Sequence, residues 1–273
     1  MPGDARATAA ALAAGRPVVL TGLARTWPAI GRWTPDWFAR TMGDVEVSLH
    51  AFTHRGAVRS TLAAFAAEID QGDRYLAWDG GVLAANPALA DDVDLRGLFP
   101  WWLGFVHTAL WMGGRRAFTP LHFDDGPPNL HAVVSGKKRF RFFAPEDSDR
   151  LYPADVYEWS TTFSTVDLRA PDLERHPRLP GAVAHDAVLE PGDVVFVPPR
   201  WWHAVWCLEP AVSINGWWMG PRALVGARRV REAARFVAHR AGLYRRGRCT
   251  CCGHGDLRQH LGWPAETDTR GDA

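Results

Sequence analysis

Residues 118–143 have the sequence FTPLHFDDGPPNLHAVVSGKKRFRFF, in which three short β-strand patterns are separated by turn residues at 125–128 and at Gly136. Residues 108–220 contain five further runs of the same kind: TALWMG (108–113), HDAVLE (185–190), DVVFVP (193–198), HAVWCL (203–208) and AVSINGWW (211–218). Eight short strands at this spacing predict a mainly β core, a jelly-roll or a barrel.

The chain on either side of these strands has a different pattern. Residues 1–107 mix helix and strand signals, including expected helices over 34–43 and 60–72, so we expect an α+β N-terminal part. Residues 144–182 interrupt the strands with a segment rich in Pro, Asp and Arg, a candidate for substrate contact or a lid. Residues 221–273 predict one amphipathic helix with a basic face, followed by a tail that contains Cys and His.

Composition limits the class of protein. The 273 residues include 31 Lys and Arg against 30 Asp and Glu, a net charge of +1, which excludes a strongly basic nucleic-acid-binding arm or an acidic tail as the main feature. No apolar run approaches the ~20 residues that span a membrane, so no membrane partner is expected. Most of the 4 cysteines crowd into residues 249–252 without a disulfide-like spacing, which favours a cytoplasmic protein.

The first of the quoted strands indicates a metal site. His122 and Asp124 are two residues apart, so in a strand both side chains project from the same face. His203, at the start of a later strand, is the candidate for a third ligand, and two histidines with one carboxylate hold Fe(II) while leaving adjacent positions open. A 2-oxo acid and O2 can take those positions. The alternative is a polar pair at a strand end and a core histidine whose hydrogen bonds are satisfied.

A second signal lies in the strand that contains Lys138. Alternation places Lys138 on the same face as Phe140 and Phe142, where an ammonium group is costly to bury unless it meets an anion. The distal carboxylate of 2-oxoglutarate would be such an anion; alternatively, Lys138 lies at the barrel mouth and extends its ammonium group into water. Three polar residues fit the same pocket as a group, although each alone is more typical of a turn or a strand edge: Thr119, Asn129 and Asn215.

Four motifs follow one another in the chain: TPLHFD (119–124), NLHAVVSGKKRF (129–140), EPGDVVFVPPRWWH (190–203) and SINGWW (213–218). Their residues and spacing closely resemble the JmjC and cupin-like (cupin 8) family of Fe(II)- and 2-oxoglutarate-dependent dioxygenases. The similarity is greatest to the branch that contains the asparaginyl hydroxylase of hypoxia-inducible factor. The segments RPVVLTGLARTWPAI (16–30) and RYLAW (74–78) also resemble that branch, so the resemblance covers roughly residues 15–220.

The resemblance implies that the jelly-roll is a double-stranded β-helix, and it implies a role for each matching residue. It implies an iron site made of His122, Asp124 and His203. It also implies two groups of co-substrate ligands: Lys138, Thr119 and Tyr75 at the distal carboxylate of 2-oxoglutarate, and Asn129 and Asn215 beside its 1-carboxylate. The segment between Asp124 and Gly136 is one residue longer than the family pattern, which affects the assignment of Asn129 and the substrate side of the site.

The C-terminal tail contains a second set of metal-binding residue types: Cys249, Cys251, Cys252, His254 and His260. They include one C-x-x-C pair, at 249 and 252, and are of the kinds that bind Zn²⁺ in a small closed site. No second C-x-x-C accompanies them in the sequence, so a tail without metal is the other interpretation.

We therefore expect an enzyme, a 2-oxoglutarate-dependent hydroxylase that acts on a protein or peptide side chain and releases succinate and CO2. Two alternatives stay open. One is the same chemistry on a small molecule, an RNA base such as one in tRNA, or a biosynthetic peptide; the other is a non-catalytic cupin that binds a ligand or partner. Apart from tRNA, no nucleic acid is expected as a partner. The resemblance also implies a homodimer through the C-terminal helix, whose basic face alone indicates only a solvated surface.

Overall fold

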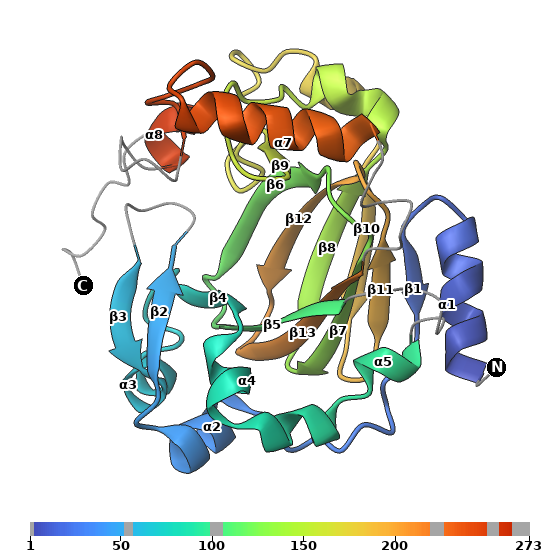
Figure 1. The fold of residues 1–273 in the computed structure, drawn as a ribbon, viewed down its shortest axis with the longest axis vertical. Coiled ribbons are helices and arrows are strands. Elements are labelled where there is room, and N and C mark those ends of the chain that lie inside the picture. The colour runs from blue at the N-terminus through green and yellow to red at the C-terminus, as the bar shows by residue number, and fades with distance from the viewer. Residues whose placement is uncertain (1–2, 52–56, 99–105, 219–226, 250–256, 264–273) are drawn as a thin grey trace.

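The computed structural model describes residues 3–51, 57–98, 106–218, 227–249 and 257–263 (Figure 1). All eight strands predicted for the core are present. They are β5 (Val106–Gly113), β6 (Phe118–Asp124), β7 (Asn129–Ser135), β8 (Lys138–Phe143), β10 (His185–Leu189), β11 (Val194–Val197), β12 (Trp202–Cys207) and β13 (Ala211–Trp218).

The core strands form two facing sheets with jelly-roll connectivity, so the predicted fold class is confirmed. One sheet contains the run β11-β7-β13-β5 and the other contains β10-β8-β12-β6, with antiparallel pairing throughout. Figure 1 shows the strands running side by side between a helical layer at one end and helix α7 (Ala227–Arg240) at the other.

The turn between β7 and β8 depends on Gly136. This residue has a positive φ of 68°, and a Cβ there would clash with the carbonyl of Pro210 and with Ala211. Because only glycine adopts this conformation without strain and leaves room for the neighbouring chain, the turn predicted from the sequence forms at this point. It sets the register that turns Lys138 inward.

The N-terminal part adds strands to the first sheet and helices beneath it. Its strands are β1 (Val18–Leu20), β2 (Glu46–His50), β3 (Val58–Thr61) and β4 (Tyr75–Asp79), and the complete 8-stranded order is β1-β11-β7-β13-β5-β4-β2-β3. The helices are α1 (Gly3–Ala13), α2 (Pro35–Met42), α3 (Leu62–Ala67), α4 (Gly81–Ala85), η1 (Pro87–Asp92) and α5 (Leu95–Leu98). The α+β character expected from the sequence is therefore observed.

Helix α3 is shorter than the helix expected over 60–72. Thr61 caps it, because its Oγ1 accepts a hydrogen bond from the N–H of Ala64 at 3.2 Å, and residues 58–61 before the cap form β3. Beyond Ala67 the chain leaves the helix and packs against the turn at Gly114, where any Cβ would clash with the Ile69 carbonyl. A contact between segments distant in the chain thus ended the helix, which its own periodicity did not reveal.

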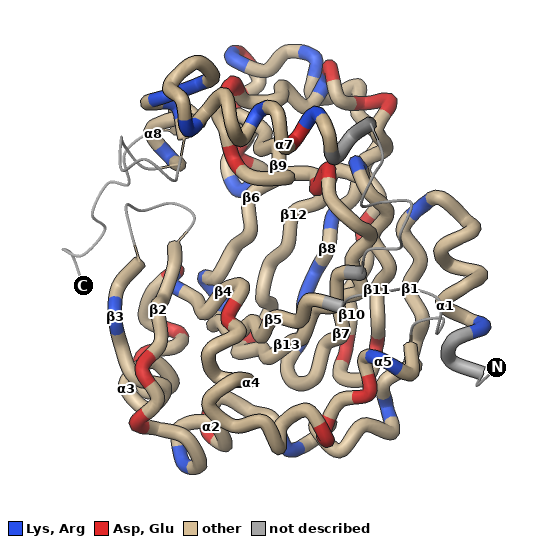
Figure 2. The backbone as a smooth tube through the Cα atoms, in the orientation of Figure 1, with Lys and Arg blue, Asp and Glu red and all other residues tan. Residues whose placement is uncertain are grey.

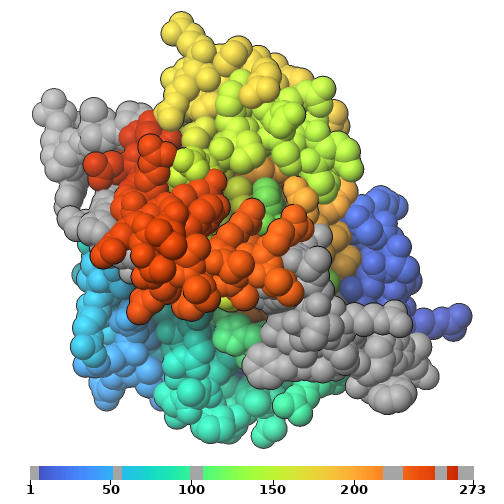
Figure 3. Space-filling view, turned by 45° about the horizontal axis from the view of Figure 1, so that its top comes forward, coloured from blue at the N-terminus to red at the C-terminus, as the bar shows by residue number. Residues whose placement is uncertain are grey.

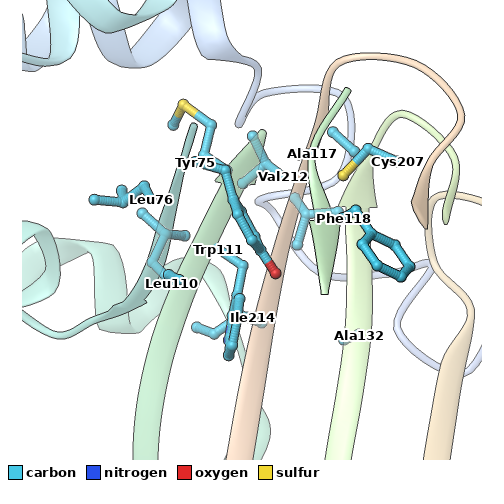
Figure 4. Packing of buried hydrophobic residues seen from close by; sticks show 14 of the residues in the cluster. Tyr75, Leu76, Leu110, Trp111, Ala117, Phe118, Ala132, Cys207, Val212 and Ile214 are labelled. Atoms are coloured by element: carbon cyan, nitrogen blue, oxygen red, sulfur yellow. The ribbon is translucent and has the colours of Figure 1, made fainter. Parts of the chain in front are cut away.

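The hydrophobic core joins the N-terminal part to the barrel. Figure 4 shows Tyr75 reaching from β4 towards Trp111 and Ile214, with Leu76 and Val212 beside it. The Tyr75 and Trp111 rings lie 5.6 Å apart, and both side chains are at least 94% buried, with 3% and 6% of their surface exposed. Because this packing fixes β4 against β5, Tyr75 is held at the inner end of the barrel.

The segment 144–182 contains regular structure that its composition did not predict. It forms the short helices η2 (Pro145–Arg150) and η3 (Leu179–Gly181) and strand β9 (Thr161–Phe163), which pairs with β6 and extends the second sheet to the order β10-β8-β12-β6-β9. Figure 3 shows this segment, in yellow and yellow-green, on the same face of the molecule as α7 in orange. A final short helix, α8 (Leu257–Leu261), follows in the tail, and none of the described helices is long and apolar enough to cross a membrane.

Candidate metal centre and co-substrate cavity

Two neighbouring strands bring the three predicted metal ligands together. His122 and Asp124 lie on one face of β6, and His203 of β12 is directly opposite His122 in the antiparallel register. The two imidazole rings are 4.1 Å apart, and one potential ligand atom from each of the three residues lies within 4.8 Å of the others. This is the only cluster of three or more potential metal ligands among the residues that the structure describes.

Backbone contacts hold both histidines in the tautomer that can bind a metal through Nε2. Nδ1 of His122 lies 2.7 Å from the carbonyl oxygen of Pro120, and Nδ1 of His203 lies 3.0 Å from that of Trp201. A carbonyl only accepts, so each Nδ1 carries the hydrogen and each Nε2 keeps its lone pair. Burial is the main cause that lowers the pKa of both histidines to about 4, and the neighbouring His122 contributes to the lowering at His203.

The carboxylate of Asp124 completes the donor set. Burial raises its pKa, and this effect is opposed by His203 and by the hydroxyl of Thr161, which donates a hydrogen bond to Oδ1 at 3.2 Å. Two neutral imidazoles and one oriented carboxylate on one side of a cavity fit a divalent transition metal such as Fe(II). Sequence analysis missed Thr161, because the strand that carries it was not predicted.

A cavity of about 290 Å³ extends from this cluster into the barrel, and Lys138 lines it. Only 1% of Lys138 is exposed, and its Nζ donates a hydrogen bond to Oγ of Ser213 at 2.6 Å. Burial lowers the pKa of this ammonium group, and among the described residues no carboxylate forms an ion pair with it. A buried cation without a counter-ion is unfavourable, so an anionic ligand in the cavity would satisfy it.

Thr119 and Tyr75 line the same cavity. Their hydroxyl groups are hydrogen-bonded to each other, and both side chains are at least 95% buried, with 5% and 3% exposed. Burial raises the pKa of Tyr75 well above its ordinary value, so its hydroxyl stays protonated and available as a donor. The structure therefore brings all three residues assigned to the distal carboxylate around one space.

The two asparagines face each other across β7 and β13. Asn215 donates from Nδ2 to Oδ1 of Asn129 at 3.0 Å, and both side chains line the cavity. The longer segment after Asp124 therefore does not remove Asn129 from the site. Oδ1 of Asn215 is buried without a hydrogen-bond partner in the protein.

One further cavity residue and the hydrogen-bond partner of Lys138 were missed from the sequence, although their spacing offered a signal. His131 is two residues beyond Asn129, and Ser213 is two residues before Asn215, so each shares a strand face with a predicted ligand. His131 is 5% exposed, its Nε2 is buried without a partner, and Nε1 of Trp111 in the same cavity is also unpartnered. Unpaired buried polar atoms around one cavity indicate that it accommodates a polar ligand.

The second metal-site prediction, in the tail, stays untested. Cys249 is buried and not in a disulfide, and its backbone forms a bridge with Tyr157. Cys251, Cys252 and His254 lie outside the described residues.

These features define a class of protein, a jelly-roll in which a cluster of two histidines and one aspartate lines an internal cavity together with a buried lysine. Residues 4–223 match the cupin-like domain family, and the chain belongs to this family. The similarity expected from the four motifs is therefore confirmed at the level of the family.

Curated relatives carry JmjC names as well. The chain is 28% identical to lysine-specific demethylase 8 of Xenopus tropicalis over 219 residues, which cover 74% of this chain and 48% of that protein. Over 227 residues it is 28% identical to Jumonji C domain-containing protein 5 of Drosophila melanogaster, covering 75% and 55% of the two chains.

HSPB1-associated protein 1 of Rattus norvegicus matches a shorter part of the chain at a higher sequence identity. The two are 46% identical over 112 residues, 40% of this chain and 23% of that protein. The chain thus spans between about a quarter and about half the length of these relatives. The family supports an iron- and 2-oxoglutarate-dependent oxygenase as the general kind of protein, whereas the comparisons give no support to the homodimer expected through α7.

Proposed function

We propose that the chain is an Fe(II)- and 2-oxoglutarate-dependent oxygenase that hydroxylates a side chain of a protein or peptide. The observation that carries this proposal is the combination of the His122, Asp124 and His203 cluster with the buried ammonium group of Lys138 in one cavity. A metal cluster alone would fit many functions. The added inward cation, which lacks a counter-ion among the described residues, favours a co-substrate with a carboxylate at its far end.

The three ligand residues would hold the iron at the open end of the barrel. When bound, iron couples the oxidative decarboxylation of 2-oxoglutarate to succinate and CO2 with the activation of O2 for attack on a C–H bond. The protein contributes neutral imidazoles, held by the carbonyls of Pro120 and Trp201, and a carboxylate oriented by Thr161. These contacts fix the ligand atoms before the metal arrives.

The inner end of the cavity would hold the distal carboxylate of 2-oxoglutarate. Lys138 supplies a charged donor that Ser213 orients, and the hydrogen-bonded hydroxyls of Thr119 and Tyr75 supply neutral donors beside it. Charge-assisted hydrogen bonds are stronger than neutral ones, so Lys138 is expected to contribute most of the affinity. Asn129, Asn215 and His131 line the wall between the two ends and would contact the remaining oxygen atoms of the co-substrate.

Aromatic side chains at the cavity support a polypeptide as the prime substrate. Trp78 and Trp159 line the cavity while 45% and 46% of their surface stays exposed, and Trp217 also lines it. Exposed tryptophans beside a deep pocket are typical of surfaces that bind a peptide and admit one of its side chains. The names of the relatives, a lysine-specific demethylase and a protein associated with HSPB1, also favour protein substrates or partners.

The test combines two measurements on the full chain. Purified without oxygen and then supplied with Fe(II), 2-oxoglutarate and O2, the protein is expected to produce succinate, and omission of either the iron or the keto acid should abolish it. Mass spectrometry of a peptide library should then detect a gain of about 16 Da, one oxygen atom, or the loss of a methyl group if the hydroxylated carbon is an N-methyl. Absence of succinate formation under all these conditions would contradict the proposal and favour a binding module.

A further inference from the structure

A second cavity lies on the other side of β6 from the metal centre. Its volume is about 300 Å³, and its walls come from the end of β6, the 153–155 segment, the turn at Arg200, helix α7 and the turn after α7. Figure 3 shows α7 lying next to the 144–182 segment on this face, and Figure 2 shows basic and acidic positions side by side along α7. None of its lining residues lines the metal-site cavity.

Strand alternation explains why the same two strands, β6 and β9, line two separate cavities. Asp124 and its cross-strand neighbour Thr161 line the first cavity, whereas Phe123 and its neighbour Thr162 line the second. Successive side chains of a strand point to opposite faces. The β6 and β9 pair therefore separates the metal-site cavity from the second cavity.

The second cavity has an excess of guanidinium groups. Four arginines and three carboxylates line it: Arg200, Arg231, Arg235, Arg245, Asp125, Asp155 and Glu232. Two of the arginines already have partners, since Arg235 pairs with Glu232 at 2.9 Å and Arg245 pairs with Asp155 at 2.7 Å. Among the described residues, Arg200 and Arg231 have no ion-pair partner.

The backbone conformation of Arg200 and its contact with the Phe123 ring hold this residue at the cavity. Its φ is 68°, in the left-handed region that non-glycine residues seldom adopt, and its N–H donates to the Asp124 carbonyl at 2.8 Å. Its guanidinium carbon lies 5.5 Å from the centre of the Phe123 ring, a cation–π contact. Backbone strain of this kind persists where the surroundings determine the conformation and is concentrated at functional sites.

We propose that this cavity binds a small anion with a carboxylate or phosphate group, held by Arg200 and Arg231. The guanidinium fork matches both kinds of group, because it presents parallel N–H donors to two oxygen atoms. The carboxylate partners of Arg235 and Arg245 neutralise these two arginines, so Arg200 and Arg231 are left to hold the ligand. The proposal does not depend on the oxygenase activity, because it concerns a different cavity and is tested by binding alone.

The experiment is an isothermal titration of the full chain with inorganic phosphate and, separately, with succinate, at one ionic strength set with chloride. Beyond any succinate that the first cavity takes up at Lys138, wild-type protein should bind one of the two anions at one further site, and the better ligand identifies the chemical class. Arg200→Gln/Arg231→Gln should weaken binding at least about tenfold, since it removes two charge-assisted contacts. Arg40→Gln/Arg96→Gln is the matched control, because it removes the same charge from exposed residues of α2 and α5 and should bind as the wild type does.

Two further variants separate the sites and exclude misfolding as the cause. Asp125→Asn removes the remaining carboxylate of the second cavity and should tighten binding about two- to fivefold, a gain that a damaged protein would not produce. Lys138→Met alters only the first cavity and should leave the affinity unchanged. The proposal is overturned if neither anion binds saturably, if the double arginine variant binds as tightly as the wild type, or if Lys138→Met rather than the arginine pair abolishes the signal.

Discussion

The two faces of strand β8 carry basic side chains under opposite physical conditions. Facing inward, Lys138 is 1% exposed and lacks an ion-pair partner among the described residues. Facing outward on the same strand, Arg141 makes two hydrogen bonds to Asp186, at 2.7 and 2.6 Å, in a partly exposed pair. Inward charges destabilise the empty protein and gain favourable contacts only with a ligand, whereas outward charges already have partners and contribute little to stability.

The largest effect is expected from the inward face of β6. His122→Ala removes one of three metal ligands, so 2-oxoglutarate-dependent succinate formation should fall at least about a hundredfold. Arg59→Gln, in an exposed ion pair with Glu46 on β3 and β2, is the control and should keep wild-type turnover. Near-normal turnover in the His122 variant would remove the metal assignment.

A comparison of adjacent lysines sharpens the contrast on β8. Lys138→Met should weaken 2-oxoglutarate binding by about 10- to 100-fold, because a charge-assisted contact is lost. The same variant should raise the free energy of unfolding without co-substrate by about 1 kcal/mol or more, since it removes a buried unpaired charge.

Lys137→Met is the matched control for this prediction. Lys137 is exposed and pairs with Glu190 at 2.6 Å, so its replacement should change neither 2-oxoglutarate affinity nor stability measurably. Calorimetric titration and urea unfolding measure both quantities. Equal effects of the two substitutions would show that the inward position of Lys138 determines neither 2-oxoglutarate affinity nor stability.

A smaller effect is expected at His131, which the sequence analysis overlooked. Its Nε2 is buried without a partner in the protein, and burial, followed by the charge of Lys138, lowers its pKa well below the ordinary value. His131→Phe should therefore weaken 2-oxoglutarate binding about fivefold, the value of one neutral hydrogen bond, and should not reduce stability in its absence. A stability loss with unchanged affinity would assign His131 to packing.

The smallest effect belongs to the outward pair of Arg141 and Asp186. The hydrogen bond from Arg141 lowers the pKa of Asp186 below its ordinary 3.8, so the pair stabilises the protein above that pH and the contribution disappears as the pH falls through the folded value. Asp186→Asn should lower the free energy of unfolding by less than about 1 kcal/mol at neutral pH, and by progressively less as the pH falls through the folded pKa of Asp186. Asp44→Asn, an exposed control, should show no such difference in urea unfolding.

Much of the site could be predicted because strand alternation is a local property. The two-residue spacing of His122 and Asp124, and the inward place of Lys138 between Phe140 and Phe142, follow from the period of a strand. The order of the motifs then suggested His203. The helix over 60–72, in contrast, was predicted too long, because the close packing of Ile69 against Gly114 is a long-range contact.

The sequence by itself determined the strands, their inward faces and the chemical types of the ligands, since these depend on periodicity and turn residues within a few positions. Only the tertiary structure decided that Ser213 meets Lys138, that Thr161 orients Asp124 and that Arg200 and Arg231 line one cavity. Each of these relations joins residues distant in the chain. They arise from sheet order and packing, which no local pattern encodes.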